Sequence, residues 1–286
     1  MPGQVVEDLG VFHEPLLIFG GPYGNLQATE AMQERAEALS IPPSRVICNG
    51  DSVAYCAQPE ETVNTLREWG VRALMGNCEE SLATGQPDCG CGFEPGTSCS
   101  LLAEDWYRFC NERLSSDSKS WMGELPAGFQ FTMGGLSFRL VHGALSSINR
   151  FLFASSPAVS KLEELARRDA DVVIGGHSGL PFGECLDNRY WLNSGVIGMP
   201  ANDGTQDGWF LLLYPMEAGV RCEWHRLFYN ARAAQQAMYD AGQDNGYAAA
   251  LTSGYWPSMD VLPEYERTQQ GMEIKPCTMM IIPHKA

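Results

Sequence analysis

The sequence is poor in basic residues. It has 19 Lys and Arg against 35 Asp and Glu, which gives a formal net charge of −16 at pH 7. A surface this acidic repels polyanions, so we expect neither nucleic acid nor an anionic membrane as a partner. A small phosphorylated molecule is still compatible with this charge, because one bound metal ion reverses its sign locally.

Long apolar runs are missing as well. The most apolar run, residues 209–214, is far too short to cross a bilayer. Residues 1–14 have neither the basic region nor the apolar region of a secretory signal peptide. These two observations predict a cytoplasmic protein.

Cysteine, in contrast, is plentiful, with ten residues. In a reducing compartment we expect buried thiols or ligands rather than disulfides. Cys89, Cys91 and Cys99 lie in a Gly-rich stretch, and their spacing leaves three possibilities open. They could form a zinc corner with Cys78 or Cys110, which would make a redox or thiolate–metal function an alternative. They could form a disulfide, or they could be reduced thiols in a loop over the site, which is the state we expect.

Strands and helices alternate over the first eighty residues. Apolar runs predict strands at 15–19, 46–48 and 71–75, with helices between them at about 26–39 and 59–69. Parallel strands joined by right-handed crossovers would bring their carboxyl ends to one rim.

The remaining chain is less regular. Residues 81–100 lack any period and predict a loop, which two helical pieces follow before a hairpin over 129–141. A buried strand at 171–174 and a mainly antiparallel group over 184–228 come next. The tail is predicted to be helical from 231 and irregular from 259.

Five of the predicted strand ends carry a glycine next to a residue of interest. The first, Gly21, offers nothing to a metal, but the other four supply one carboxylate, one amide and two imidazoles: Asp51, Asn77, His142 and His177. Such a mixed set of oxygen and nitrogen ligands suits Mn²⁺, Fe or Zn²⁺ better than Mg²⁺ or Ca²⁺.

The ordered motifs around these residues resemble those of the calcineurin-like metallophosphoesterase superfamily, and most closely its small prokaryotic phosphodiesterase branch. The motifs are Gly50-Asp51, Gly76-Asn77-Cys78-Glu79, Val141-His142-Gly143 and Gly176-His177-Ser178-Gly179, with further likeness at 24–28 and 192–200. The resemblance implies an α/β fold, a four-layer α-β-β-α sandwich of two mixed sheets flanked by helices. We expect a single domain over 1–286, with a Cys/Gly-rich and helical insertion at about 81–125 and a helical or irregular extension at about 231–286.

Two motifs depart from the family pattern. The family's first motif is Asp-x-His-Gly-Asn, and the matching residues here are Gly21-Pro22-Tyr23-Gly24-Asn25. The last motif is Gly-His-x-His, and Gly179 stands in place of its second His. In the family the missing side chains all serve one metal, whereas the residues matching Asp51, Asn77, His142 and His177 serve the other. We therefore expect one Mn, Fe or Zn ion per chain.

The resemblance implies a metal-dependent phosphoesterase that hydrolyses a monoester or diester of a small phosphorylated molecule. Asp51, Asn77 and His142 would take part in catalysis, with Tyr23 replacing part of the lost charge. Cys78 stands where many relatives have a His thought to donate a proton, although the prokaryotic branch often has Cys there. The alternative is an inactive homologue that binds a metal or a phosphate ligand, with residues 20–25 holding phosphate through backbone N–H groups at a helix N-terminus.

Overall fold

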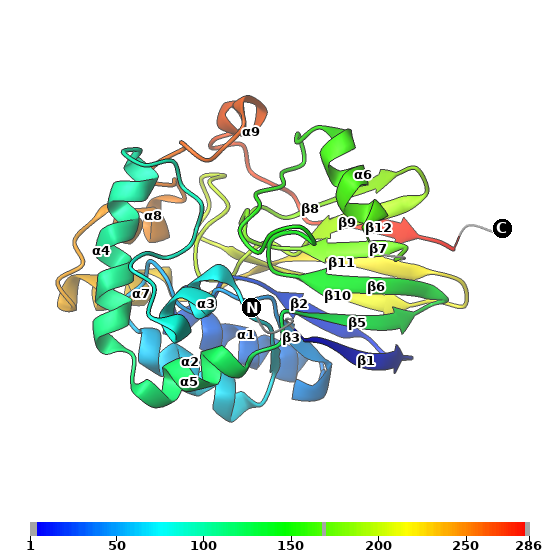
Figure 1. Ribbon diagram of the computed structural model, residues 1–286, viewed down its shortest axis with the longest axis horizontal. Coiled ribbons are helices and arrows are strands. Elements are labelled where there is room, and N and C mark those ends of the chain that lie inside the picture. Colours follow the sequence, from blue (N-terminus) through cyan, green and yellow to red (C-terminus); the bar gives the residue numbers. More distant parts are fainter. Residues whose placement is uncertain (1–4, 168–169, 284–286) are drawn as a thin grey trace.

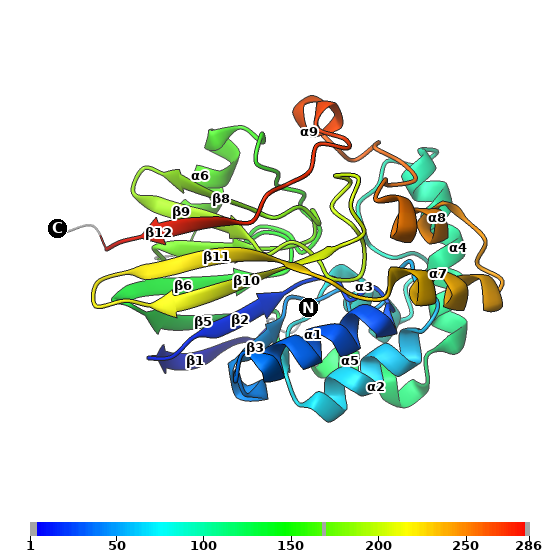
Figure 2. The same cartoon turned by 180° about the vertical axis from the view of Figure 1, so that it is seen from behind.

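Two six-stranded mixed sheets lie face to face in the computed structural model, which describes residues 5–167 and 170–283 (Figures 1 and 2). The strand orders are β1-β5-β6-β7-β9-β8 and β12-β11-β10-β2-β3-β4. Helices α1 and α2 cover the outer face of the second sheet, and α6 packs on the outer face of the first. The predicted α-β-β-α sandwich is confirmed.

The strands of this fold are β1 (Val6–Phe12), β2 (Leu16–Phe19), β3 (Val46–Cys48), β4 (Arg72–Ala73), β5 (Gly128–Met133), β6 (Leu136–Val141), β7 (Val172–Gly175), β8 (Phe182–Leu186), β9 (Arg189–Asn193), β10 (Gly208–Pro215), β11 (Val220–Leu227) and β12 (Cys277–Ile281). The α-helices are α1 (Leu26–Ala38), α2 (Pro59–Trp69), α3 (Asn77–Thr84), α4 (Ser98–Arg113), α5 (Ser116–Glu124), α6 (Ala158–Ala166), α7 (Ala231–Asp240), α8 (Gly246–Ser253) and α9 (Glu264–Thr268). A short 3₁₀ turn, Pro43–Arg45, precedes β3.

Strands β2, β3 and β4 run parallel, as predicted from the alternation of strands and helices. Strands β6, β7 and β9 are also parallel neighbours in the opposite sheet. Over 184–228 the expected antiparallel pairing is present between β8 and β9 and between β10 and β11. The parallel pairing of β9 with β7 was not expected, because a fully buried strand reads the same in either direction. The consequence for function is that β3, β4, β6 and β7 end on the same side of the sandwich.

Local chemistry sets the helix boundaries. The Asn25 side chain accepts a hydrogen bond from the Ala28 backbone N–H and caps α1. Helix α2 begins with Pro59 and ends where Gly70 adopts a left-handed φ of 74°. Helix α3 begins directly after the short β4 and continues to Thr84, so the loop predicted from residue 81 starts later than expected.

The core lies between the sheets and is built from the inward side chains of both. Its largest members include Phe129, Phe138, Trp209 and Trp224, each at most 2% exposed. Trp191 lies on the other face of the first sheet and packs against Leu165 of α6. These tryptophans are therefore core residues.

The C-terminal segment is more ordered than the sequence suggested. Strand β12 pairs antiparallel with β11 and extends the second sheet, although its Pro-rich surroundings predicted irregular structure. Strand β1, which pairs with β5, was also missed. Both are edge strands with several exposed residues, so their apolar pattern is weak.

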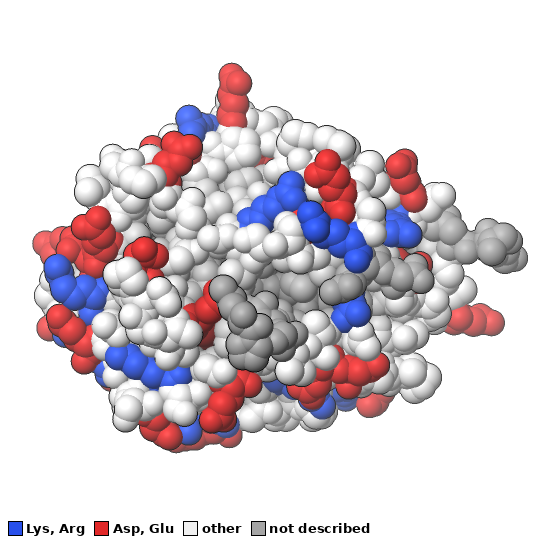
Figure 3. All heavy atoms as spheres, viewed as in Figure 1, with Lys and Arg blue, Asp and Glu red and all other residues white. Residues whose placement is uncertain are grey.

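Acidic side chains are spread around the edge of the face seen in Figure 3, and a short band of basic side chains lies nearer its middle. The negative charge on this face is thus distributed rather than collected in one cluster. Among residues 5–167 and 170–283, none of the helices is long and apolar enough to cross a membrane.

We predict that Ile281→Ala lowers the free energy of unfolding by about 2–5 kcal/mol, because Ile281 of β12 is 0% exposed and its truncation leaves a cavity in the core. Ile282 is the matched control, since it is 51% exposed and its truncation should change stability by less than about 0.5 kcal/mol. Urea unfolding of the two variants measures both values. A loss of stability in Ile281→Ala as small as that in Ile282→Ala would show that Ile281 contributes nothing to the core.

Candidate metal centre

Four side chains from four strand ends converge on one point. Asp51 follows β3, Asn77 begins α3 after β4, and His142 and His177 follow β6 and β7. His142 Nε2 lies 3.2 Å from Asp51 Oδ2, 3.1 Å from Asn77 Oδ1 and 3.2 Å from His177 Nδ1. Ligand atoms bound at about 2.0–2.2 Å to one ion are themselves about 3–3.5 Å apart. His177 Nδ1 and Asp51 Oδ2 are 4.0 Å apart, and Asp51, His142 and His177 form a group that could hold a metal ion, with Asn77 Oδ1 beside it.

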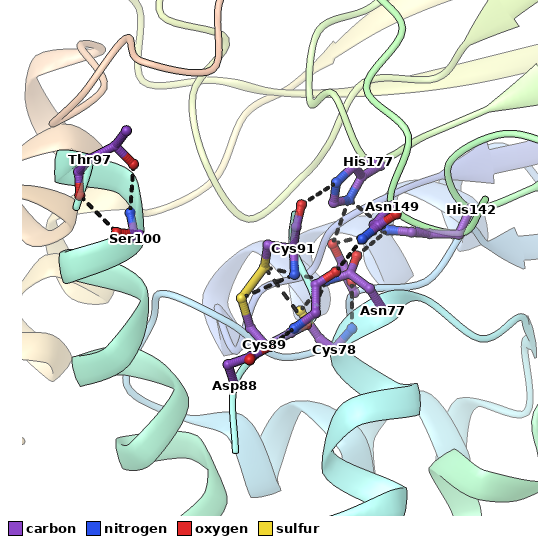
Figure 4. Close-up of a disulfide and its surroundings, with 12 residues drawn as sticks. Asn77, Cys78, Asp88, Cys89, Cys91, Thr97, Ser100, His142, Asn149 and His177 are labelled. Carbon is purple, nitrogen blue, oxygen red and sulfur yellow. Dashed lines mark hydrogen bonds and ion pairs between the residues drawn. A yellow bond between two sulfur atoms is a disulfide. The ribbon is translucent and has the colours of Figure 1, made fainter. Parts of the chain in front are cut away.

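In three of these side chains, a nitrogen that points away from the centre lies within hydrogen-bond distance of a backbone carbonyl oxygen. His142 Nδ1 lies 2.8 Å from the Asn49 oxygen, and His177 Nε2 lies 3.2 Å from the Cys91 oxygen. Asn77 Nδ2 donates to the Cys89 oxygen at 2.8 Å (Figure 4). With these N–H groups engaged, His177 Nδ1 and Asn77 Oδ1 present lone pairs to the centre, and His142 Nε2 does so when that ring is neutral.

Glycines before the ligands allow the four strand ends to approach one another. A Cβ on Gly50 would lie 2.7 Å from His142 Nδ1, and a Cβ on Gly76 would lie 2.6 Å from Asp51 Oδ1. Asp51 and His177 themselves adopt left-handed φ values of 55° and 60°, which are uncommon outside glycine. Strained backbone of this kind is found at functional sites.

Glu79 supports the loop that carries Asp51, a role that its place in the Gly76-Asn77-Cys78-Glu79 motif did not predict. Its buried carboxylate accepts hydrogen bonds from the backbone N–H groups of Asp51 (2.9 Å), Ser52 (2.6 Å) and Gly76 (2.8 Å), and from the Ser52 hydroxyl. It thus ties the loop after β3 to the start of α3. An acid three residues into a helix is a capping pattern, and that was the available signal.

The surroundings shift the pKa values of Asp51, His142 and His177 in different directions. Burial alone would raise the pKa of Asp51, but His142 outweighs it and holds that pKa below its usual value. The pKa of His142 is raised in turn, since Asp51 overcomes the effect of burial. Burial and His142 lower the pKa of His177 to about 4, so that ring is neutral at pH 7 and free to bind a metal.

Comparison with known proteins agrees with this geometry. Residues 13–214 match the calcineurin-like phosphoesterase superfamily domain. The chain belongs to this superfamily.

Two solved structures show the same fold. A metallophosphoesterase from Sphaerobacter thermophilus has a TM-score of 0.66 at 19% sequence identity, with 85% of this chain and 100% of that chain covered. A hypothetical protein from Pyrococcus horikoshii has a TM-score of 0.70 at 14% identity, with 85% and 99% covered. A search of curated proteins finds no match. Members of the superfamily are generally metal-dependent phosphoester hydrolases, and the convergent Asp51, His142 and His177 are a possible metal-binding group.

An aromatic ring stands at each departure from the superfamily's motifs. A Cβ on Gly21 would lie 2.5 Å from Tyr23 Cζ, so the Tyr23 ring fills the space into which a side chain at 21 would project. A Cβ on Gly179 would lie 3.5 Å from the Trp256 ring. Burial, reinforced by Asp51, raises the pKa of Tyr23 well above its usual value, so its phenol is protonated and neutral. The role expected of Tyr23, to replace part of the lost charge, stays a prediction, and a neutral phenol would fill it by donating a hydrogen bond.

The expected phosphate cradle at residues 20–25 is wrong. The backbone N–H groups of Gly21, Tyr23, Gly24 and Asn25 all donate to backbone oxygens, those of Gly50, Asp51, Ser52 and Pro22 respectively, at 2.9–3.1 Å. Pro22 has no N–H. The loop uses its donors to pack against the segment around Asp51, and they are not directed at a ligand.

The expected reduced state is also wrong for two cysteines. Cys89 and Cys91 form a disulfide, while Cys99 is a free thiol at the start of α4. The paired sulfurs cannot serve a zinc corner in this state. Cys78 is buried, and its backbone N–H lies 3.4 Å from Asp51 Oδ1. It is not among the residues that line the adjoining pocket, and its role as a proton donor stays a prediction.

A pocket adjoins the centre, and six of the side chains that line it are aromatic. Asp51 and His177 are also part of its lining, and the described lining includes no Lys or Arg. Tyr55 packs edge-on against Tyr23 at 4.8 Å between centroids and stacks on Tyr247 at 4.3 Å. Phe151 lies beside His177, with 4.1 Å between the ring centroids. The cavity is therefore suited to the organic part of a ligand whose charge meets the metal.

We predict that Glu79→Gln weakens Mn²⁺ binding about 10- to 100-fold, because the carboxylate that orders the Asp51 loop loses charge and an acceptor. The control is Glu34→Gln on the exposed face of α1, which should bind as the parent protein does. Isothermal titration with Mn²⁺ measures both affinities. Unchanged binding by Glu79→Gln would contradict the positioning role.

Proposed function

We propose that the protein is a phosphoesterase that uses a single metal ion to hydrolyse a small phosphorylated molecule. The ligands would be Asp51, Asn77, His142 and His177. The observation that carries this proposal is the convergence of their four ligand atoms, with the distances of 3.1–3.2 Å around His142 Nε2. The mixed oxygen and nitrogen set suits Mn, Fe or Zn.

A mononuclear centre is the form that the surroundings support. Gly21 and Gly179 provide no ligands, and the Tyr23 ring takes the space beside Gly21. Asp51 would then be a terminal ligand of one ion rather than a bridge between two ions. The opposite side of the carboxylate faces the pocket that Tyr23 and Val196 help to line.

An ion held here would supply Lewis acidity and, by lowering the pKa of a bound water, a nucleophile at neutral pH. The chain's own residues would do the rest. The Tyr23 phenol, which lines the pocket, would donate a hydrogen bond to a phosphoryl oxygen and so replace part of the stabilisation that a second metal ion gives. The aromatic walls would exclude water and bind the ester group.

The lining also favours a diester over a monoester. A monoester carries up to two negative charges near neutral pH and a diester carries one, whereas the described pocket offers no basic side chain beside the centre. The positive charge of a single ion is therefore balanced more closely by a diester than by a monoester. In the competing hypothesis, an inactive homologue that binds a metal or a phosphate ligand, the phosphate cradle at 20–25 loses support because the N–H groups of residues 21 and 23–25 already donate to backbone oxygens, whereas the metal-binding form stays open.

We predict that the protein binds one Mn²⁺ per chain and hydrolyses bis(p-nitrophenyl) phosphate faster than p-nitrophenyl phosphate. Asp51→Asn should abolish both binding and hydrolysis, because it removes the charged ligand. Asp244→Asn, at an exposed position, is the matched control and should retain both. Metal analysis after dialysis gives the stoichiometry. Metal binding without hydrolysis of either ester at any pH would instead support the inactive homologue.

We predict that Tyr23→Phe retains one metal per chain but lowers kcat on the order of 100-fold, as expected for the loss of one donor to developing charge. The ring that fills the space beside Gly21 is kept, so the stoichiometry should not change. Steady-state kinetics with bis(p-nitrophenyl) phosphate tests this. An unchanged kcat would mean that the Tyr23 hydroxyl only lines the cavity.

A further inference from the structure

Three consecutive backbone carbonyls next to the metal centre each accept a hydrogen bond from a different side chain. The Cys89 oxygen accepts from Asn77 Nδ2 at 2.8 Å, and the Gly90 oxygen accepts from Asn149 Nδ2 at 2.9 Å. The Cys91 oxygen faces His177 Nε2 at 3.2 Å (Figure 4). One three-residue segment therefore holds two ligands that come from opposite sheets.

This segment has no regular secondary structure to keep it in place. Residues 85–97, between α3 and α4, contain neither helix nor strand. The disulfide between Cys89 and Cys91 closes the segment covalently, and both cysteines are buried, at 5% and 4% exposure. Gly90, between them, has a left-handed φ of 62° that allows the chain to turn within three residues.

We propose that the Cys89–Cys91 disulfide is a redox-sensitive clamp that positions Asn77 and His177 for the metal. With the disulfide closed, the two carbonyls are held where Asn77 Nδ2 and His177 Nε2 meet them. When the disulfide is reduced, the segment gains backbone freedom. Metal binding must then order Asn77 and His177, which lowers the binding free energy. Cys89 and Cys91 are positioning residues in this account, which rests on the metal site proposed above.

The redox step is an ordinary thiol–disulfide exchange. A thiolate of a small dithiol attacks one of the two sulfurs and forms a mixed disulfide, and the second thiol of the reductant displaces the protein sulfur. Two electrons and two protons pass to Cys89 and Cys91, and the dithiol becomes a disulfide. Cys91 lines the pocket, which gives a small reductant a route to the bond.

The test is the Mn²⁺ dissociation constant of the full chain before and after treatment with a dithiol, measured anaerobically by isothermal titration once the reductant is removed. Reduction should weaken binding about 10- to 100-fold, the usual effect of losing contacts behind a ligand, and reoxidation should restore it. The double variant Cys89→Ser/Cys91→Ser should bind Mn²⁺ weakly in both conditions, and its dissociation constant should not change with the reductant.

Two controls separate the clamp from a general effect on stability. Cys185→Ser removes an exposed free thiol and should keep the full response to reduction. Ile281→Ala destabilises the core away from the site and should bind Mn²⁺ as the parent protein does.

Equal Mn²⁺ affinity in the oxidised and reduced protein would overturn the clamp and leave the metal site standing. An absence of Mn²⁺ binding in both states would overturn the proposed function itself. Tighter Zn²⁺ binding after reduction would also overturn the clamp, because the freed thiolates would then be acting as ligands.

Discussion

The structure around the centre depends on keeping one buried carboxylate, Asp51, in place at the end of a strand. An ionised carboxylate removed from water is costly unless charge and hydrogen bonds compensate for it. His142 supplies compensation at 3.2 Å, and Glu79 accepts a hydrogen bond from the Asp51 backbone N–H at 2.9 Å. A second acid so close to the first raises the energy of the empty site, which a bound cation would lower. The arrangement is therefore understandable as a site built for a positive ion.

The same constraint explains how the site differs from the superfamily pattern. The motif resemblance implies that the side chains replaced at Gly21, Tyr23 and Gly179 serve one metal, and the space next to Gly21 holds the Tyr23 ring. Asp51 thereby keeps one set of neighbours intact and meets an uncharged surface on its other side. The aromatic walls around Tyr55 and Phe151 continue that surface into the pocket. Affinity for a substrate would then depend on the ion for charge and on the rings for shape.

Much of this could be predicted from the sequence, because it depends on local patterns. Buried apolar runs ending in glycine placed β2, β3 and β7, and the order of the motifs around Asp51, Asn77, His142 and His177 carried the fold. The features that were missed depend on tertiary neighbours. The pairing of Cys89 with Cys91, the occupied backbone donors of residues 20–25 and the use of Glu79 as an anchor leave no periodic trace. Edge strands β1 and β12 were missed because one exposed side makes their pattern weak. The cytoplasmic location stays a prediction, and two of the cysteines expected to be reduced there, Cys89 and Cys91, form a disulfide.

The most direct test is the number of metal ions in crystals of the protein grown with Mn²⁺ and measured at the manganese absorption edge. Our account predicts one anomalous peak per chain, within bonding distance of Asp51 Oδ2, Asn77 Oδ1, His142 Nε2 and His177 Nδ1, with the Tyr23 ring still against Gly21. A second peak beside Tyr23, or no peak at this position, would contradict it.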